Sequence, residues 1–290
     1  MGLLYISPWI IGFIAFGVYP LGSSIYYSLT NYNILGKPDF IGFKNYLYMF
    51  TKDRDFYHSL WVTFKYVLYS VPMKILSALF FALILNQSIG FIKQYRTIFY
   101  LPSIFAGNIS IALLWKFLFM PRGIINNLIA RLGIPSVPWL TDPKFALFTI
   151  SLINIWAFGA SMVIFLVGLK QIPKELYEAG RVDGASKIRL FFMITLPLLT
   201  PQILFNLVMQ TIAAFQSFTA AFVITGGGPL KSTFVYSLKI YQEGFSFFKM
   251  GYAAALSWIL FIIIMAATLI LFKSSKSWLH YQDSGEEGIL

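Results

Sequence analysis

Seven charged side chains lie close together in one short segment of this chain, from Pro173 to Pro201. The charged residues in that segment are Lys174, Glu175, Glu178, Arg181, Asp183, Lys187 and Arg189. The chain as a whole is 58% hydrophobic and only 11% charged. Because unpaired charges are costly in a hydrocarbon layer, this segment has to lie outside a membrane. The chemistry it offers is recognition of a partner through charge.

The spacing of proline, glycine and serine predicts two short helices in this segment. Pro173 suits a first helical turn, Lys174–Asp183 forms the first helix, and Gly184 ends it in a sharp turn. Ser186 can then cap a second helix. The expected apolar, inward face of this second helix consists of Ile188, Phe191, Phe192 and Leu196. Pro197 and Pro201 follow it. Composition alone leaves an ordinary interfacial loop and a docking segment equally open.

Motifs for catalysis and for small ligands are missing from the sequence. The chain has no cysteine, no His-Glu-x-x-His, no nucleophile elbow and no paired intramembrane aspartates. The loop Gly226–Thr233 is not a Walker A motif, because Leu230 precedes its lysine and Pro229 removes a backbone donor. We expect no enzyme activity and no metal site. The formal charge of +11 fits basic residues beside lipid head groups, without the basic, aromatic face that binds nucleic acid.

The elements that position the charged segment are predicted to be membrane-spanning helices. A chain that is 58% hydrophobic and 19% aromatic lacks the polar surface of a soluble domain, and a span takes about 20 apolar residues. The first run lacks the basic region and cleavage site of a signal peptide. The predicted spans are Leu3–Leu29, Leu60–Leu85, Thr97–Met120, Phe145–Leu169, Gln202–Ile224 and Gly251–Phe272. The sequence thus predicts an all-α membrane protein with six transmembrane helices.

The six predicted spans contain no Asp, Glu or His. Carriers driven by protons or sodium usually place such residues in the membrane, so a secondary carrier is disfavoured. Lys65 and Lys116 can extend to the head groups. Lys74 lies deeper, where an unpaired lysine costs about 2.5–3.5 kcal/mol. Its expected partner is a neighbouring subunit or backbone carbonyls, and an anionic ligand is the alternative.

Polar and aromatic side chains inside the apolar runs could line a path for a sugar. Amides satisfy hydroxyl groups, and aromatic faces stack on the apolar faces of a sugar ring. The alternative role is hydrogen bonding between helices, worth about 0.6 kcal/mol each. The candidate residues of a substrate path are Lys74, Asn108, Trp115, Asn154, Trp156, Asn206, Gln210, Gln216 and Trp258.

The order of residues in the charged segment resembles the EAA loop in the membrane subunits of binding-protein-dependent ATP-binding-cassette (ABC) importers. The matching positions are Glu178, Ala179, Asp183, Gly184, Ala185, Ile194, Leu196, Pro197 and Pro201. Gly180 departs from the commoner second alanine, which loosens that helical turn by up to about 1 kcal/mol. In that family the loop is cytoplasmic and its coupling helix docks on an ATPase subunit. The residues that the resemblance assigns to ATPase coupling are Glu178, Ala179, Gly180, Asp183, Gly184, Ala185, Leu196 and Pro197.

Other positions are similar to the maltose-type sugar permeases. They are Thr225–Pro229 with Ser232 and Thr233, Arg96 with Leu101 and Pro102, Leu114–Lys116, and Gly123 with Asn127. The resemblance covers nearly the whole chain from the second span onward. It implies that the outer loop formed by Gly226, Gly227, Gly228 and Pro229 contacts a solute-binding protein.

The resemblance implies one permease subunit of a type I ABC sugar importer, multi-pass in a bacterial cell membrane, with both termini cytoplasmic. The expected organisation is one transmembrane domain, residues 1–290, with the coupling loop at 170–200. The implied partners are a second homologous permease, two ATPase subunits that bind ATP and Mg, an extracellular solute-binding protein and membrane lipid. This chain itself is expected to hold no cofactor. Basic residues are balanced between the two sets of loops, so the resemblance and not charge sets this orientation.

The expected cargo is an oligosaccharide, and a polyol or glycerol-phosphate-like solute is the alternative within the family. Because the intramembrane lysines have no carboxylate partner in the predicted spans, an acidic, uronate-containing glycan is a further hypothesis. A secondary carrier and an accessory membrane protein are the alternatives from other classes. A carrier would work without an ATPase, and an accessory protein would tolerate Gly184→Pro or Glu178→Lys.

Overall fold

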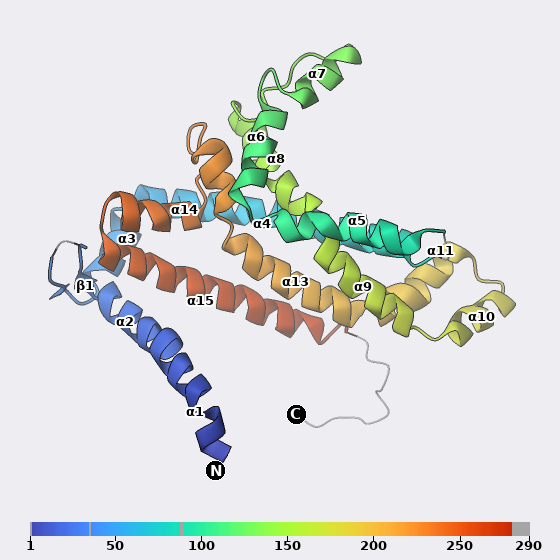
Figure 1. Ribbon diagram of the computed structural model, residues 1–290, viewed down its shortest axis with the longest axis horizontal. Coiled ribbons are helices and arrows are strands. Elements are labelled where there is room, and N and C mark those ends of the chain that lie inside the picture. The colour runs from blue at the N-terminus through green and yellow to red at the C-terminus, as the bar shows by residue number, and fades with distance from the viewer. Residues whose placement is uncertain (1, 35, 88–89, 280–290) are drawn as a thin grey trace.

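The computed structural model describes residues 2–34, 36–87 and 90–279, and its regular structure is almost entirely helical (Figure 1). The helices, with η marking wider π-helical turns, are α1 (Gly2–Phe13), η1 (Ile14–Val18), α2 (Tyr19–Ser28), α3 (Lys44–Thr51), α4 (Arg54–Leu85), α5 (Ile92–Phe105), α6 (Ile109–Phe119), α7 (Ile124–Arg131), α8 (Pro143–Trp156), α9 (Gly159–Gln171), α10 (Lys174–Val182), α11 (Lys187–Leu190), η2 (Phe191–Thr195), α12 (Leu196–Leu198), α13 (Thr200–Phe215), η3 (Ala221–Thr225), α14 (Tyr236–Tyr241), η4 (Gln242–Ser246) and α15 (Met250–Ser275). Strand β1 (Thr30–Asn31) pairs antiparallel with β2 (Asp39–Phe40), in the register Thr30 with Phe40. Residues 280–290, which the predicted domain includes, lie outside the described part of the chain.

Within the described residues, six helical stretches are long and apolar enough to cross a membrane, if each bent pair of helices counts as one. Four are single stretches, namely Tyr5–Ser28, Arg54–Leu85, Ile109–Arg131 and Met250–Ser275. Two are bent pairs, Pro143–Trp156 with Gly159–Gln171 at 48° and Lys187–Leu198 with Thr200–Phe215 at 63°. The predicted number of six is confirmed.

The predicted third, fourth and fifth spans are wrong as continuous helices. Thr97–Met120 is interrupted at residues 106–108, Phe145–Leu169 at 157–158, and Gln202–Ile224 at 216–218. No proline causes these breaks. Close packing of helices accounts for one of them, because a Cβ at Gly159 would collide with the backbone of Phe99 and Tyr100 in α5. Broken backbone at membrane depth is tolerated only where protein covers it or where it lines a cavity.

Helix α4 supplies much of the core. It packs against α8, α9 and α13 (Figure 1). Its buried Tyr66, Ala78 and Ala82 belong to the same apolar cluster as Ile150 and Phe165. Small residues at a helix interface let neighbouring backbones approach closely, which is the usual basis of helix packing in membranes. The bundle is therefore a rigid frame for its two ends.

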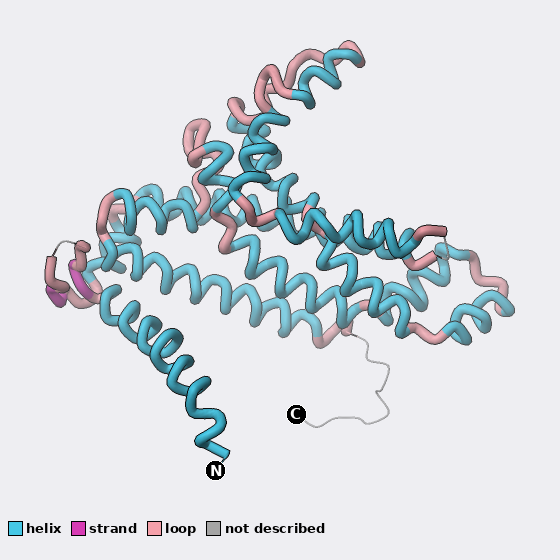
Figure 2. The backbone as a smooth tube through the Cα atoms, in the orientation of Figure 1, coloured by secondary structure: helices cyan, strands magenta, loops and turns pink. Residues whose placement is uncertain are grey.

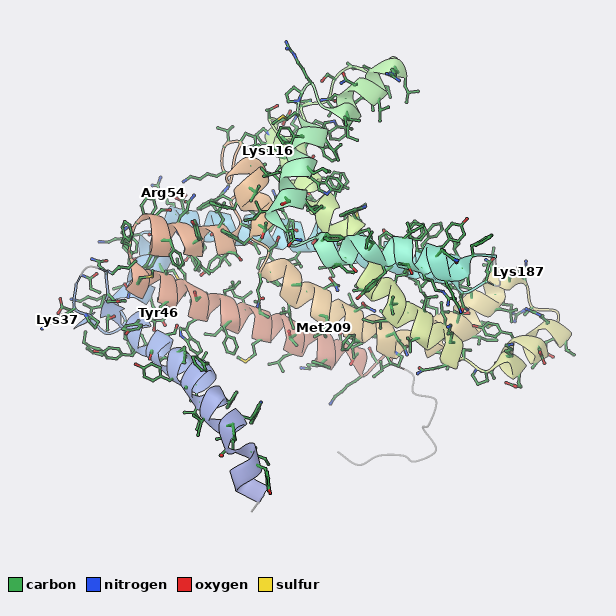
Figure 3. The ribbon with its side chains drawn as sticks, viewed as in Figure 1. Lys37, Tyr46, Arg54, Lys116, Lys187 and Met209 are labelled. Atoms are coloured by element: carbon green, nitrogen blue, oxygen red, sulfur yellow. The ribbon has the colours of Figure 1, made fainter. Side chains whose placement is uncertain are left out.

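The two ends of the bundle differ in structure (Figures 1 and 2). Helices α10 and α11 occupy one end, and α3, α14 and the two strands occupy the other. Side chains mark these ends clearly: Lys187 lies at the α11 end and Lys37 at the opposite one (Figure 3). Helices α6 and α7 project from the middle of the bundle, where Lys116 is placed (Figure 3). The charged segment of the sequence is thus one whole end of the molecule.

A buried ionic cluster joins α4, α14 and α15 at the end opposite α10. The Asp53 carboxylate caps α4 by accepting from the Phe56 N–H at 3.2 Å. It also receives the Lys239 Nζ at 2.7 Å and the Tyr252 hydroxyl at 2.5 Å. Burial alone would raise the pKa of Asp53, but the hydrogen bonds from Lys239 and Tyr252 outweigh it and hold the pKa below its ordinary value. Lys239 also pairs with Glu243 at 3.2 Å, so its buried charge is fully compensated.

Candidate coupling segment and translocation cavity

The turn at Gly184 is built as the sequence predicts. Gly184 has a φ of +76°, and its N–H donates to the Arg181 carbonyl at 3.0 Å. The Ala185 N–H donates to the Gly180 carbonyl at 2.9 Å. These two hydrogen bonds form a Schellman motif, which satisfies the last carbonyls of α10. Ser186 then caps α11 by accepting from the Arg189 N–H at 3.3 Å, so both helices have defined ends.

Helix α10 is fixed to the helix that follows it. Gly180 allows this contact, since a Cβ there would lie 2.5 Å from the Leu190 Cδ2. The hydroxyl groups of Tyr177 and Thr195 form a second link, at 2.9 Å. The glycine that departs from the EAA pattern is therefore the position where the two short helices touch. Two side-chain contacts therefore join α10 to Lys187–Leu198.

The outer surface of this piece is charged and partly apolar. Glu178, Asp183 and Ala179 are exposed, and none of the ion pairs among the described residues involves α10. Val182 at the tip is 88% exposed. Of the predicted inward apolar face, Ile188 and Phe192 do not pack on the bundle and are exposed on this chain. The predicted inward residues Phe191 and Leu196 are half-buried.

The return toward the bundle is a rigid bend. Leu196 and Pro197 lie in the last turn of Lys187–Leu198, which meets α13 at 63°. The buried side chain of Leu190 packs beneath α10, and Leu199 at the bend is fully buried. Between α10 and α13 the chain consists of the turn at Gly184 and the helical residues Lys187–Leu198. Helix α13 runs from this bend to Phe215, where the helix breaks.

A cavity of about 220 Å³ lies where the interrupted helices meet. Ala106 and Gly107 line it from the break between α5 and α6, and Gln216 and Ser217 from the break after α13. Tyr66 of α4 also lines the cavity, and its phenolic oxygen accepts a hydrogen bond from the Ser217 hydroxyl at 3.0 Å. Discontinuous helices around a cavity are the arrangement in which membrane transporters bind their cargo.

Lys74 is linked to the cavity by a hydrogen bond to the side-chain amide of Asn154. Its Nζ donates to the Asn154 Oδ1 at 3.0 Å, and Asn154 lines the cavity from α8. Lys74 is buried, and it takes part in no ion pair among the described residues. Lys65 on the same helix is exposed, with its ammonium 5.2 Å from the Trp61 ring. Lys116 donates to the Val223 carbonyl at 3.4 Å.

The structure brings only some of the candidate path residues together. Asn154 and Gln216 line the cavity, and Asn108 follows the cavity-lining Gly107 directly. Trp115 and Trp156 meet edge to face at 6.0 Å.

The remaining candidates do not line the cavity. The Gln210 side chain donates to Ser161 at 3.1 Å, and the buried Asn206 donates to the Gln202 carbonyl at 3.0 Å. Trp258 packs against Phe261 within α15, apart from the cavity lining.

The glycine-rich outer loop is a compact turn tied to α4. Gly226 and Gly227 have positive φ values of +61° and +89°, so both use the freedom of glycine. The Thr233 hydroxyl donates to the Gly228 carbonyl at 2.7 Å. Lys231 pairs with Asp55 at the start of α4 at 2.7 Å. Leu230 is left 88% exposed at the tip, as a free contact surface.

Comparison with known proteins places the chain in one family. Residues 47–280 match the family described as binding-protein-dependent transport system inner membrane component. The chain belongs to this family. The permease is 48% identical to the Probable ABC transporter permease protein YesP of Bacillus subtilis (strain 168), over 98% of the chain and 93% of that protein. It is 37% identical to the Sulfoquinovosyl glycerol transport system permease protein SmoG of Agrobacterium fabrum, with 88% and 84% covered.

The permease also matches a solved transporter along its length. It is similar to a chain in the crystal structure of a bacterial alginate ABC transporter in complex with alginate pentasaccharide-bound periplasmic protein. The TM-score is 0.81 and the sequence identity 25%, and the match covers 95% of the permease and 94% of that chain. The predicted type I ABC importer permease fold and the family resemblance are therefore confirmed. The permease is a multi-pass membrane protein of an ABC importer.

Sequence reasoning missed Tyr66 in the cavity wall and Lys239 in the buried ionic cluster. Tyr66 stands within an apolar helix, where a tyrosine hydroxyl is a weak but readable signal of a polar neighbour. Lys239 reads as an ordinary loop lysine, and nothing near it in the sequence indicates that Asp53 is its partner.

Proposed function

We propose that this permease and a second homologous permease form the translocation path of an ATP-driven oligosaccharide importer. The observation that supports the proposal most strongly is α10, a fixed helix at one end of the bundle whose charges have no partner in the described part of this chain. Exposed charges around an apolar tip suit a cleft on another protein. A loop that only lies at the membrane surface would not need these fixed contacts between α10 and the following helix.

In the proposed mechanism, closure of two ATPase subunits displaces α10, and the chain's own contacts transmit the movement. Glu178 and Asp183 contact the ATPase, and Gly184 holds the turn. Gly180 against Leu190 passes the movement to Lys187–Leu198. The bend at Leu196 and Pro197 passes it to α13, whose far end borders the cavity at Gln216. Coupling and translocation are thus joined by one continuous helical path.

ATP and Mg belong to the ATPase subunits in this proposal, and the permease has no catalytic activity of its own. Among the described residues, no three His, Cys, Asp or Glu side chains lie close enough to hold a metal ion. The cavity contains amides and hydroxyl groups, which bind and orient but do not carry out acid–base chemistry at neutral pH.

The proposed cargo is a carbohydrate, most simply an oligosaccharide. The cavity of about 220 Å³ is below the roughly 300–1,000 Å³ of complete small-molecule sites, which fits a path whose other wall is a second permease. The pentasaccharide named for the solved alginate transporter supports this class. A polyol or glycerol-phosphate-like solute is the second candidate, favoured by the glycerol in the name of the Agrobacterium relative.

The proposed orientation places α10 in the cytoplasm and the outer loop Gly226–Pro229 against an extracellular solute-binding protein. Both termini are then cytoplasmic, in a bacterial cell membrane, and residues 1–290 form one transmembrane domain. Exposed Leu230 at the loop tip and the anchoring pair of Lys231 with Asp55 suit a contact surface that must stay in place.

The test is co-purification of the permease with the second permease and the ATPase subunits encoded with it, and reconstitution in lipid vesicles. ATP hydrolysis and uptake are then measured with the solute-binding protein and a panel of neutral and acidic oligosaccharides. Hydrolysis stimulated by the loaded binding protein, with uptake that stops without ATP, supports the proposal. Uptake that continues in vesicles lacking the ATPase subunits would point to a secondary carrier and refute it.

A further inference from the structure

One charge near the cavity has no counter-charge in the described structure. Lys74 is 8% exposed, and its ammonium group has one hydrogen-bond partner among the described residues, the Asn154 side-chain oxygen at 3.0 Å. An ammonium group has three donors, so two remain open. The other buried lysine, Lys239, is held by Asp53 and Glu243. Lys239 therefore has the counter-charges that Lys74 lacks among the described residues.

The position of the uncompensated charge connects it to the translocation cavity. Asn154 both receives Lys74 and lines the cavity beside Gln216 and Ser217. The cavity-lining residues include no Asp or Glu. Helix α6 begins just after the cavity-lining Gly107, so the positive end of its dipole lies at the same place. An anion in this cavity would meet favourable charge on two sides.

We propose that Lys74 and Asn154 form an anion-binding subsite that takes the acid group of a singly charged sugar, such as a uronate, during translocation. This inference rests on the proposed function and adds the charge of the cargo. A single lysine balances one negative charge, which fits a carboxylate better than a phosphate monoester with a charge near −2. Asn154 can hydrogen-bond a neighbouring hydroxyl group while it positions the ammonium group. Lys74 itself does not line the cavity, and in this proposal its flexible stem moves the ammonium group past Asn154 toward the bound acid group.

The experiment compares two glycans of equal length in the reconstituted importer. One is a uronate-containing oligosaccharide that the binding protein accepts, and the other is its carboxyl-reduced, neutral derivative. Each variant's uptake of each glycan is divided by the wild-type uptake of the same glycan, so that the preference of the binding protein cancels. The readout is the ratio of the two normalised values, acidic over neutral, measured on assemblies of equal size-exclusion profile.

Lys74→Met is expected to lower this ratio about tenfold to a hundredfold, the effect of losing one charge-assisted hydrogen bond. Asn154→Asp gives the buried Lys74 a carboxylate partner in place of an amide, so this variant is expected to fold. It is expected to lower the ratio at least tenfold as well, because the new carboxylate competes with the acidic sugar. Lys65→Met on the same helix is the matched control and should leave the ratio unchanged, since Lys65 is exposed beside Trp61.

Each alternative role of Lys74 gives a different result. If Lys74→Met and Asn154→Asp reduce both glycans equally, Lys74 has a structural partner and the subsite is refuted. If neither variant changes the ratio by more than twofold, the subsite is refuted too. If the wild-type assembly imports neither glycan, the proposed function itself has failed, and that result is visible before any variant is made.

Discussion

Replacing Gly184 by proline tests whether the turn after α10 transmits movement of α10 to the helices that follow. Gly184 has a φ of +76°, whereas a proline ring holds φ near −65°. The substitution also removes the N–H that donates to the Arg181 carbonyl at 3.0 Å. The Schellman motif therefore cannot form, and α10 loses its fixed angle to Lys187–Leu198.

The size of the effect follows from these two losses. A proline that breaks helical hydrogen bonding costs about 3 kcal/mol, and every 1.4 kcal/mol is a factor of ten. Lost from the coupled conformation, that free energy lowers the population of this conformation about 100-fold relative to the uncoupled one. We expect ATP-driven uptake to fall about 100-fold, while the bundle itself, whose core lies along α4, still assembles in the membrane.

The chain contains a matched control for this substitution. Gly133 after α7 also has a φ of +76°, and its N–H donates to the Ala130 carbonyl at 3.0 Å. Gly133→Pro therefore breaks the same motif at the same local cost, but away from α10. Uptake and ATP hydrolysis are measured in vesicles for both variants. Wild-type uptake by assembled Gly184→Pro, or an equal loss with Gly133→Pro, would refute the reasoning.

Three further substitutions probe the coupling segment and the ionic cluster. Glu178→Lys should reduce uptake more than tenfold while the complex still inserts, because like charges at a docking surface cost several kcal/mol, and Glu178→Gln should lose less. Gly180→Val should reduce uptake by overpacking Leu190, at about 1–3 kcal/mol, and Leu190→Ala in the same chain should restore part of it. Asp53→Asn should destabilise the folded permease by about 1.5–3 kcal/mol, the loss of a charge-assisted hydrogen bond, because the buried Lys239 keeps only Glu243 as a counter-charge; this is measured as a drop in unfolding temperature. Because the pKa of Asp53 is lowered in the folded state, its contribution is present above about pH 4 and is lost as the pH falls below that value.

Each of these expectations can fail on its own. Equal uptake by Glu178→Lys and wild type would remove Glu178 from the docking surface. A double variant no better than Gly180→Val would show that the contact with Leu190 is not the cause of the loss. If acid lowers the unfolding temperature of Asp53→Asn as much as that of wild type between about pH 5 and 3, another group controls the acid response.

The coupling segment could be predicted because its determinants are local. Pro173, Gly184 and Ser186 act on the backbone within a few residues, so the ends of both helices follow from the sequence. The facing of the second helix was harder to predict. Ile188 and Phe192 are apolar yet exposed, and an amphipathic pattern cannot tell a face that packs on the bundle from one that waits for a partner.

The cavity could not be predicted, because it depends on helix breaks that no proline causes, and only the break at 106–108 contains a glycine. Ala106, Ala157 and Phe158 suit a helix as well as their neighbours do, and contacts between distant helices decide where the chain leaves it. The pairing of Lys239 with Asp53 crosses most of the chain for the same reason. Residue types therefore indicated what lies in the membrane, and packing between helices determined where a path can open.

The most direct test of the account is whether the tip of α10 meets the ATPase. The chain has no cysteine, so Val182→Cys and Leu230→Cys each introduce a unique thiol, at two side chains that are both 88% exposed and belong to opposite functional surfaces. A short thiol-directed photocrosslinker is attached to each variant in the assembled importer, and the captured subunit is identified by mass spectrometry. The account predicts that Val182→Cys captures the ATPase subunit and Leu230→Cys does not. Capture of the ATPase from Leu230→Cys, with none from Val182→Cys, would contradict it.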